Sequence, residues 1–329
     1  MRDLLHFARR TALALAASLA LAATAAQADG YPDKPIRLLV PYPPGGSTDV
    51  LGRALAELMR KDLGQTVLVE NKPGANTGIA AQTLASAPPD GYTLLLATAA
   101  TVVLNPLLYP KLPYEPARDF APVAPVASTP LVLVVRPDAP ARTFAAMIAA
   151  AKAQPGSLNY ASTGNGSTLH LAGELLQMET GTQMVHVPYK GSAPALTGLL
   201  GGETHFFIDS VGSSIPLING GKLRALAVTS SQRLPVLANV PTVAESGIPR
   251  FDVTTWFGVM APANTPAAIL DKLNATIARA TADKAFRAQF EALGLVIPPP
   301  MKPHEFTAYI QSESAKWAPL IKAKGISLE

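Results

Sequence analysis

The 329-residue sequence contains no cysteine, which excludes disulfide bonds, thiolate nucleophiles, zinc–thiolate sites and iron–sulfur clusters. Charge is also sparse: 15% of residues are charged and 48% are hydrophobic, a globular rather than a disordered composition. After residue 28 there are four histidines, and none has the H-x-x-x-H or H-E-x-x-H spacing of a metal site. We therefore expect neither a metal nor a cofactor.

Long apolar runs are confined to the first 28 residues. Three arginines precede the Ala-rich run Thr11–Ala26, and Ala26-Gln27-Ala28 has the A-x-A pattern of a signal-peptide cleavage site. The run of sixteen residues is shorter than the roughly 20 that span a bilayer, which argues against a membrane anchor. We expect a cleaved signal peptide over 1–28, export to the periplasm by the Sec or the twin-arginine route, and a mature chain from Asp29.

The net charge gives no indication of a nucleic-acid partner. Residues 1–28 carry three arginines and one aspartate, so the +4 of the whole chain falls to about +2 after cleavage. A basic excess of this size is too small to indicate binding to nucleic acid.

Two stretches of the chain, about 120 residues apart, show the same order of expected elements. Each has a strand, a Gly-Ser-Thr loop, a helix, a second strand, a Lys/Gly loop, a second helix and a third strand. The expected strands are 36–40, 66–70 and 92–97 in the first stretch, and 158–161, 184–187 and 205–208 in the second. Alternating strands and helices predict an α/β fold with mainly parallel sheets flanked by helices, and the repetition predicts two similar lobes.

Two further strands connect these lobes. The apolar strand at 131–135 precedes the second stretch, and the strand at 251–261 follows it. We predict that lobe 1 comprises 29–127 plus 255–329 and that lobe 2 comprises 128–254, with the helical tail from 267 packing on lobe 1.

The two Gly-Ser-Thr loops are candidate binding sites for an anion. Each follows a strand and opens a helix, with Ser47 or Thr48 as the expected N-cap in the first stretch and Ser167-Thr168 as the expected cap in the second. Ligands of open α/β sheets lie beyond the carboxyl ends of the strands, and helix N-termini offer unpaired N–H groups and partial positive charge. Ordinary turns and helix caps are the alternative, but the matched pair favours a carboxylate site.

The sequence contains neither the motif of serine hydrolases nor that of dinucleotide-binding loops. The order Ser162-Thr163-Gly164-Asn165-Gly166 differs from the G-x-S-x-G of a serine hydrolase, and the third glycine of a dinucleotide loop is missing. We therefore predict a binding protein rather than an enzyme. Two roles stay open: His170 either contacts an anion or packs in its helix, and Asp209 either accepts from a ligand or caps the next helix.

Several motifs carry a resemblance that covers essentially the whole mature chain. They are YPDKPIRLLVPYPPGGSTDVLGRALAELM from residue 31, ENKPGA at 70–75, PDGYT at 89–93, VPYKG at 187–191 and LRALAV at 223–228. In these motifs the sequence resembles the Bug-type extracytoplasmic solute receptors of the tripartite tricarboxylate transporter family. The resemblance implies a two-lobed, type II-like periplasmic-binding-protein fold with a ligand cleft at the hinge.

The resemblance also implies how a carboxylate is held, namely by backbone amides, Ser/Thr side chains and ordered waters. Carried over by motif, the binding residues are Tyr42, Gly45, Gly46, Ser47, Thr98, Ala99, Ser162, Gly164, Gly166, Ser167, Thr168 and His170, with Tyr189 and Asp209 close to the cleft. The segment Thr98-Ala99-Ala100-Thr101 has fewer hydroxyl groups than the family pattern, so a polar contact on that wall is expected to be missing.

The implied function is capture of a small carboxylate for uptake. The ligand class stays open between di- and tricarboxylates, aromatic carboxylates and amino acids. The implied partners are the membrane subunits of a tripartite tricarboxylate transporter. The alternative is a periplasmic sensor that feeds a signalling partner and has no transport role. We expect a monomer, because no pattern in the sequence indicates an oligomer interface.

Overall fold

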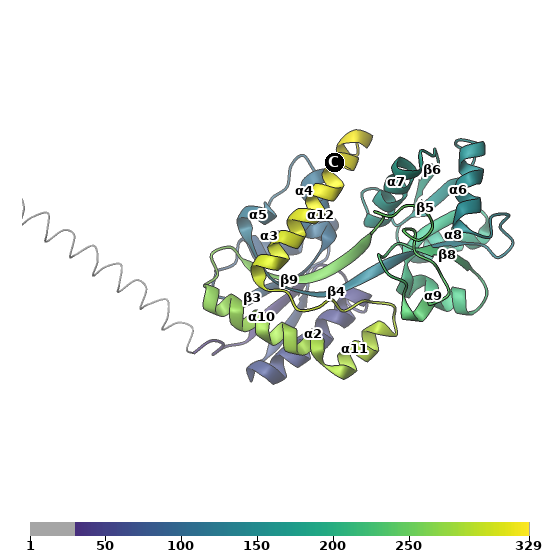
Figure 1. The fold of residues 1–329 in the computed structure, drawn as a ribbon. Coiled ribbons are helices and arrows are strands. Elements are labelled where there is room, and N and C mark those ends of the chain that lie inside the picture. The colour runs from purple at the N-terminus through teal and green to yellow at the C-terminus, as the bar shows by residue number, and fades with distance from the viewer. Residues whose placement is uncertain (1–29, 329) are drawn as a thin grey trace, which may run out of the picture.

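The computed structural model describes residues 30–328, shown in Figure 1. The predicted signal peptide and its cleavage site lie outside the described residues. The strands are β1 (Ile36–Val40), β2 (Val67–Asn71), β3 (Thr93–Thr98), β4 (Phe120–Val135), β5 (Asn159–Ser162), β6 (Val185–Pro188), β7 (Phe206–Ser210), β8 (Arg224–Val228) and β9 (Thr254–Pro262).

The nine strands form one continuous sheet in the order β2-β1-β3-β9-β4-β7-β5-β6, with β8 also paired to β4. The first sheet half consists of β1, β2, β3, β9 and residues 120–130 of β4, and the second consists of β5 to β8 and residues 131–135 of β4. β4 therefore runs from one half into the other, with β9 beside it (Figure 1). The lobe boundaries at 127/128 and 254/255 fall near this crossing and stay a prediction.

The α/β class predicted from the sequence is confirmed, but the sheet is mixed rather than mainly parallel. β1 is parallel to β2 and β3, and β5 is parallel to β6 and β7. The pairs β3–β9, β4–β9, β4–β7 and β4–β8 are antiparallel. The two strands that connect the halves run against their neighbours because the chain crosses from the first half to the second on β4 and returns on β9.

Alternate residues of the central strands pack into cores on opposite faces of the sheet. On β1, Leu38 and Val40 join one core while Leu39 joins the other, and on β3 the same alternation separates Leu94 from Leu95. Side chains of a strand point alternately to its two faces, and a strand that is covered on both faces must be apolar at nearly every position. This explains why LLV in β1 and LLLA in β3 are continuous apolar runs, although Arg37 of β1 is exposed.

The helices that cover these faces are α2 (Ser47–Leu63), α3 (Gly78–Ala85), α4 (Asn105–Leu108), α5 (Pro116–Asp119), α6 (Phe144–Ala153), α7 (Thr168–Thr180), α8 (Ser192–Gly201), α9 (Val211–Asn219), α10 (Ala267–Ala282), α11 (Lys284–Glu291) and α12 (Pro303–Lys324), with short helical segments η1 (Ala75–Thr77), η2 (Ala100–Leu104) and η3 (Pro235–Leu237). α10 packs on α2 and β4, and α12 packs on β4 from the C-terminal tail. Within residues 30–328, no helix combines the length and the apolar character needed to cross a membrane.

Candidate ligand-binding site

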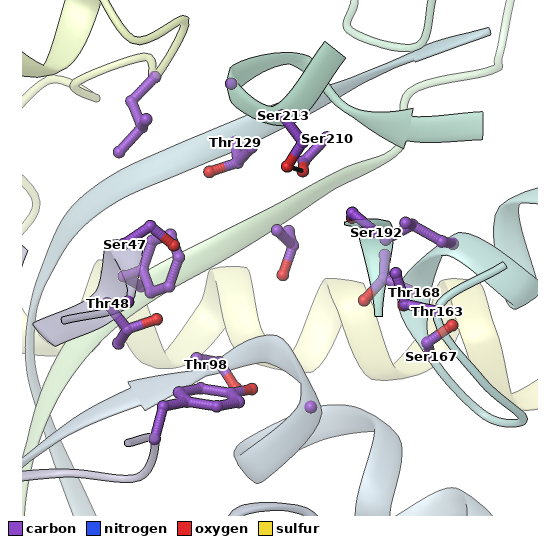
Figure 2. A pocket seen from close by; sticks show the side chains of 18 of the residues that line it. Ser47, Thr48, Thr98, Thr129, Thr163, Ser167, Thr168, Ser192, Ser210 and Ser213 are labelled. Carbon is purple, nitrogen blue, oxygen red and sulfur yellow. Dashed lines mark hydrogen bonds between the residues drawn. The ribbon is translucent and has the colours of Figure 1, made fainter. Parts of the chain in front are cut away.

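A cavity of about 850 Å³ lies where strands β1, β3, β5 and β7 end, and both sheet halves line it. Among the described residues that line it, none is charged. Its polar surface comes mainly from hydroxyl groups, ten of which Figure 2 labels. The serines and threonines of the lining are Ser47, Thr48, Thr98, Thr129, Thr163, Ser167, Thr168, Ser192, Ser210, Ser213 and Thr255.

Four helices, α2, α7, α8 and α9, begin at this cavity, because residues of their first turns line it. The N-cap Ser167 of α7 accepts a hydrogen bond from the N–H of His170 at 3.1 Å. No described side chain caps the N-terminus of α2, α8 or α9. The first N–H groups of these three helices are therefore available to a ligand oxygen, and all four helix dipoles make the cavity attractive to negative charge.

The start of α2 differs from the sequence-based prediction. Ser47 or Thr48 was the expected N-cap, but Gly46 is the N-cap and neither hydroxyl makes a capping bond. That prediction is wrong because the helix already begins at Ser47. The hydroxyl groups of Ser47 and Thr48 lie at the cavity instead (Figure 2).

The loop before α2 is held from behind by the buried carboxylate of Asp49. This carboxylate accepts the N–H of Gly45 at 2.9 Å, the Nε of Arg53 at 2.9 Å and the Nδ2 of Asn71 at 2.9 Å. The hydrogen bond from Arg53 is the largest cause of the fall in the pKa of Asp49, to about 2. A permanently ionised side chain thus fixes the loop without entering the cavity.

The second Gly-Ser-Thr loop is fixed by its own hydrogen bonds. Ser162 Oγ accepts the N–H of Gly164 at 3.0 Å, and Ser167 Oγ donates to the carbonyl oxygen of Gly164 at 2.8 Å. The N–H of Gly166 donates to Nδ1 of His170 at 3.1 Å. His170 therefore holds the loop rather than lining the cavity, and its Nδ1 must be unprotonated to accept this bond.

His170 stacks on His186, with ring centroids 3.9 Å apart, and His186 Nε2 lies 2.6 Å from Ser162 Oγ. Burial lowers the pKa of both imidazoles, and the pKa of His186 falls to about 4. Glu174, which forms an ion pair with Lys324 at 2.9 Å, opposes the shift on both rings. Two neutral imidazoles thus support the loop at neutral pH.

Seven of the fourteen residues predicted from the sequence line the cavity, and seven lie behind it or beside it. Those in the lining are Tyr42, Gly46, Ser47, Thr98, Gly166, Ser167 and Thr168. Gly45, Ala99, Ser162, Gly164, His170, Tyr189 and Asp209 do not line it, and Ala100 takes the place of Ala99. Burial raises the pKa of Tyr42, and its hydrogen bond with Thr98 opposes this.

Asp209 and Tyr189 make bonds within the protein. Asp209 is fully buried and accepts from Ser192 Oγ at 2.6 Å and from Ser214 Oγ at 2.8 Å. Burial raises the pKa of Asp209, and the two serine bonds oppose this. Tyr189 donates its hydroxyl to Glu203 at 2.8 Å. Asp209 therefore joins the start of α8 to α9 and orients Ser192, which does line the cavity.

Several lining residues were not anticipated from the sequence. Ser192, Ser210 and Ser213 each lie at a helix start that follows a strand or loop, and that pattern is readable in the sequence. Thr129 and Thr255 lie opposite each other on β4 and β9. Leu293 and Leu295 come from a loop after α11, and no sequence signal indicates their position.

The described residues contain no group of three or more His, Asp or Glu side chains that could hold a metal ion.

Comparison with known proteins identifies the family. The model of the tripartite tricarboxylate transporter family receptor matches residues 51–326. BugT of Bordetella pertussis is 40% identical over 303 residues, which cover 92% of this chain and 93% of BugT.

Two solved structures from Rhodopseudomonas palustris are similar along nearly the whole fold. Rpa4515 with adipate is 36% identical, with a TM-score of 0.79, over 90% of this chain and 99% of that chain. MatC with bound malate is 33% identical, with a TM-score of 0.75, over 88% of this chain and 100% of that chain. The resemblance seen in the sequence is confirmed: the chain belongs to the receptor family of tripartite tricarboxylate transporters.

Proposed function

We propose that this chain is a periplasmic solute-binding protein that captures a small carboxylate for uptake by tripartite tricarboxylate-type membrane subunits. The observation that carries the proposal is the uncharged, hydroxyl-lined cavity at which four helices begin.

Helix N-termini and hydroxyl groups favour a carboxylate over other ligands. The partial positive charge of each N-terminus attracts an anion and repels a cation. Among the described lining residues there is no carboxylate to accept from sugar hydroxyls or from an ammonium group. α2 offers donors on one wall, and α7, α8 and α9 offer donors on the other, so a ligand with an acceptor at each end fits best.

Capture would occur by closure of two lobes, 29–127 plus 255–329 and 128–254. The two connections, β4 and β9, are adjacent and antiparallel, with Thr129 opposite Thr255 at the cavity. Rotation about this pair brings the α2 wall and the α7 wall together. A ligand that touches both walls stabilises the closed form by its differential contacts, as expected for hinge closure.

Relatives support the carboxylate class and the location. Two similar structures hold adipate and malate, respectively, and another, BugD, is described as a periplasmic binding protein. The A-x-A motif at 26–28 supports export of this chain with removal of the signal peptide. Among the described residues that line the cavity there is no histidine, aspartate or glutamate, since His170 and His186 support the loop from behind.

Thermal unfolding of the mature chain, 29–329, against mono-, di- and tricarboxylates, amino acids and neutral sugars tests the proposal. A ligand at about 100 times its dissociation constant should raise the unfolding free energy by about 2.7 kcal/mol. Stabilisation by a carboxylate class supports the proposal, and stabilisation by sugars alone, or by none of the compounds, refutes it.

Matched variants locate the site. Ser47→Ala removes a cavity hydroxyl that caps no helix, and Ser167→Ala removes one that caps α7. Thr143→Ala is the control, because Thr143 caps α6 in the same manner at 3.2 Å and does not line the cavity. We expect both cavity variants to weaken carboxylate binding, and the control to lower stability by about 1 kcal/mol without changing affinity.

A further inference from the structure

A short segment after α11 runs along the hinge strand and reaches the cavity. We call Leu293, Gly294, Leu295 and Val296 the strap. Val296 forms an antiparallel bridge with Ser128 of β4, with N–H···O bonds of 2.8 Å in both directions. The strap is thereby fixed beside β4 at the point where that strand passes between the two sheet halves.

The strap lies in close contact with the first turn of α9. A Cβ added to Gly294 would lie 2.5 Å from Cγ1 of Val211, and one added to Gly212 would lie 2.9 Å from the carbonyl oxygen of Leu293. Gly294 also has a φ of +78°, a conformation that favours glycine. The start of α9, which is uncapped, and Leu293 are thus neighbours in the same cavity.

Leu293 leaves apolar surface in the cavity. Leu293 is 48% exposed as a residue, whereas Leu295 is partly buried against the core that includes Phe257. All three line the cavity. Covering an exposed leucine with an apolar ligand group is favourable, whereas covering it with a hydroxyl group strips that hydroxyl of water without a partner.

The hydroxyl groups nearest to α8, α9 and β3 are already engaged within the protein. Ser192 donates to Asp209, Ser210 bonds with Ser213 at 2.9 Å, and Thr98 lies 3.2 Å from Thr101 Oγ1. The proton of Ser192 is committed to Asp209, so this hydroxyl has none left to donate to a ligand carboxylate, and the uncapped N–H groups of α8 and α9 are the donors on this wall.

We propose that Leu293 and Leu295 form a specificity wall that selects carboxylates with an apolar body over carboxylates hydroxylated along the chain. The inference rests on the proposed function, because a carboxylate bound at the α9 N-terminus places the adjoining part of the ligand against Leu293. The role of the strap is to contact the ligand body directly.

Two matched ligand pairs test the wall by titration calorimetry: adipate against galactarate, and succinate against tartrate. Within each pair, chain length and charge are equal and only the hydroxyl groups differ. We expect the unhydroxylated acid of at least one pair to bind at least tenfold more tightly. Leu293→Asn should weaken that acid about tenfold and leave its hydroxylated partner within about threefold.

Val296→Asn is the control, since Val296 is 39% exposed on the same strap and does not line the cavity. It should leave both affinities within twofold. Equal binding within both pairs, or an equal loss for both acids in Leu293→Asn, overturns this inference alone. If no carboxylate of the wider panel binds, the proposed function fails and the specificity wall with it.

Discussion

Three consecutive residues beside the cavity, Ala75, Asn76 and Thr77, have φ angles of 46°, 45° and 75°. None is glycine, and the left-handed conformation costs about 1 kcal/mol or somewhat more for each such residue. The turn therefore carries strain of about 3 kcal/mol on that estimate. Asn76 lines the cavity, so the strain lies at the site itself.

Asn105, which is fully buried, holds this turn. Its Oδ1 accepts from Asn76 Nδ2 at 2.8 Å, and its Nδ2 donates to the carbonyl oxygen of Asn76 at 2.7 Å and to Thr77 Oγ1 at 3.4 Å. The same Nδ2 also donates to the hydroxyl of Tyr114 at 3.1 Å. At about 1 kcal/mol each, the three bonds from Asn105 to Asn76 and Thr77 offset the strain of the turn almost completely. The turn is stable only because these bonds are present.

Asn105→Leu should therefore affect both stability and binding. Keeping the turn would cost the protein about 3 kcal/mol of lost hydrogen bonds, and releasing it recovers part of the strain. We expect the unfolding free energy to fall by about 1 to 3 kcal/mol and Asn76 to withdraw from the cavity. If the ordered turn falls to about one molecule in ten, the dissociation constant rises about tenfold.

Urea unfolding and titration calorimetry with the best carboxylate measure the two effects separately. Asn274→Leu is the matched control, because buried Asn274 donates to the carbonyl oxygens of Val123 at 2.8 Å and Met301 at 2.7 Å, away from the cavity. It should lose about 2 kcal/mol and keep its affinity. An affinity of Asn105→Leu within twofold of the wild type would refute the link between the buried amide and the site.

Three further predictions concern the supports of the two loops and of α7. The pKa of Asp49 lies at about 2, below the ordinary 3.8, so its contribution to stability is complete above about pH 4 and is lost toward pH 2. Urea unfolding of Asp49→Asn should show a shallower loss over this range, and parallel curves would contradict the assignment. The pKa of His186 lies at about 4, below the ordinary 6.5, chiefly because of burial, so the unfolded chain binds a proton that the folded chain excludes. Stability should fall as the pH drops from 6.5 to about 4, and it should fall less steeply in His186→Phe. The charged or titratable neighbours of the His186 ring are His170, which stacks on it, and Glu174; an unchanged slope would show that His186 is not responsible. Gly173→Ala places a Cβ 2.2 Å from the ring of buried Tyr160 and should lower the free energy of unfolding by about 1–3 kcal/mol. The control Gly201→Ala meets nothing within 4 Å and should be nearly neutral. Equal effects of the two variants on the unfolding midpoint would refute the packing argument.

The sequence predicted the elements well wherever local signals agreed. The strand expected at 36–40 is β1, and the strand expected at 131–135 is the second part of β4. The helix expected from Ser167-Thr168 to Gly181 is α7, because a serine cap at one end and a left-handed glycine at the other fix its limits. The second helix expected in the second stretch is α8, whose uncapped start at Ser192, directly after Gly191, gives a weak signal in the sequence.

The candidate site was predictable to the extent that it consists of strand ends and helix starts. Gly46, Ser47, Gly166 and Ser167 reach the cavity because a parallel βα unit always places this junction at the same edge of the sheet. The role of His170 was not predictable, because its contacts with Gly166 and His186 depend on how α7 packs against β6.

The sequence by itself determined the α/β class, the repeated strand–loop–helix units and the uncharged, glycine- and hydroxyl-rich loops, because these follow from local periodicity and turn chemistry. Only the tertiary structure decided the rest of the cavity. Thr129 and Thr255 meet because β4 and β9 pair across more than a hundred residues of chain. Leu293 lies at the cavity because Val296 bonds to Ser128. Such contacts depend on strand register and on the path of the returning chain, and no local signal in the sequence encodes either.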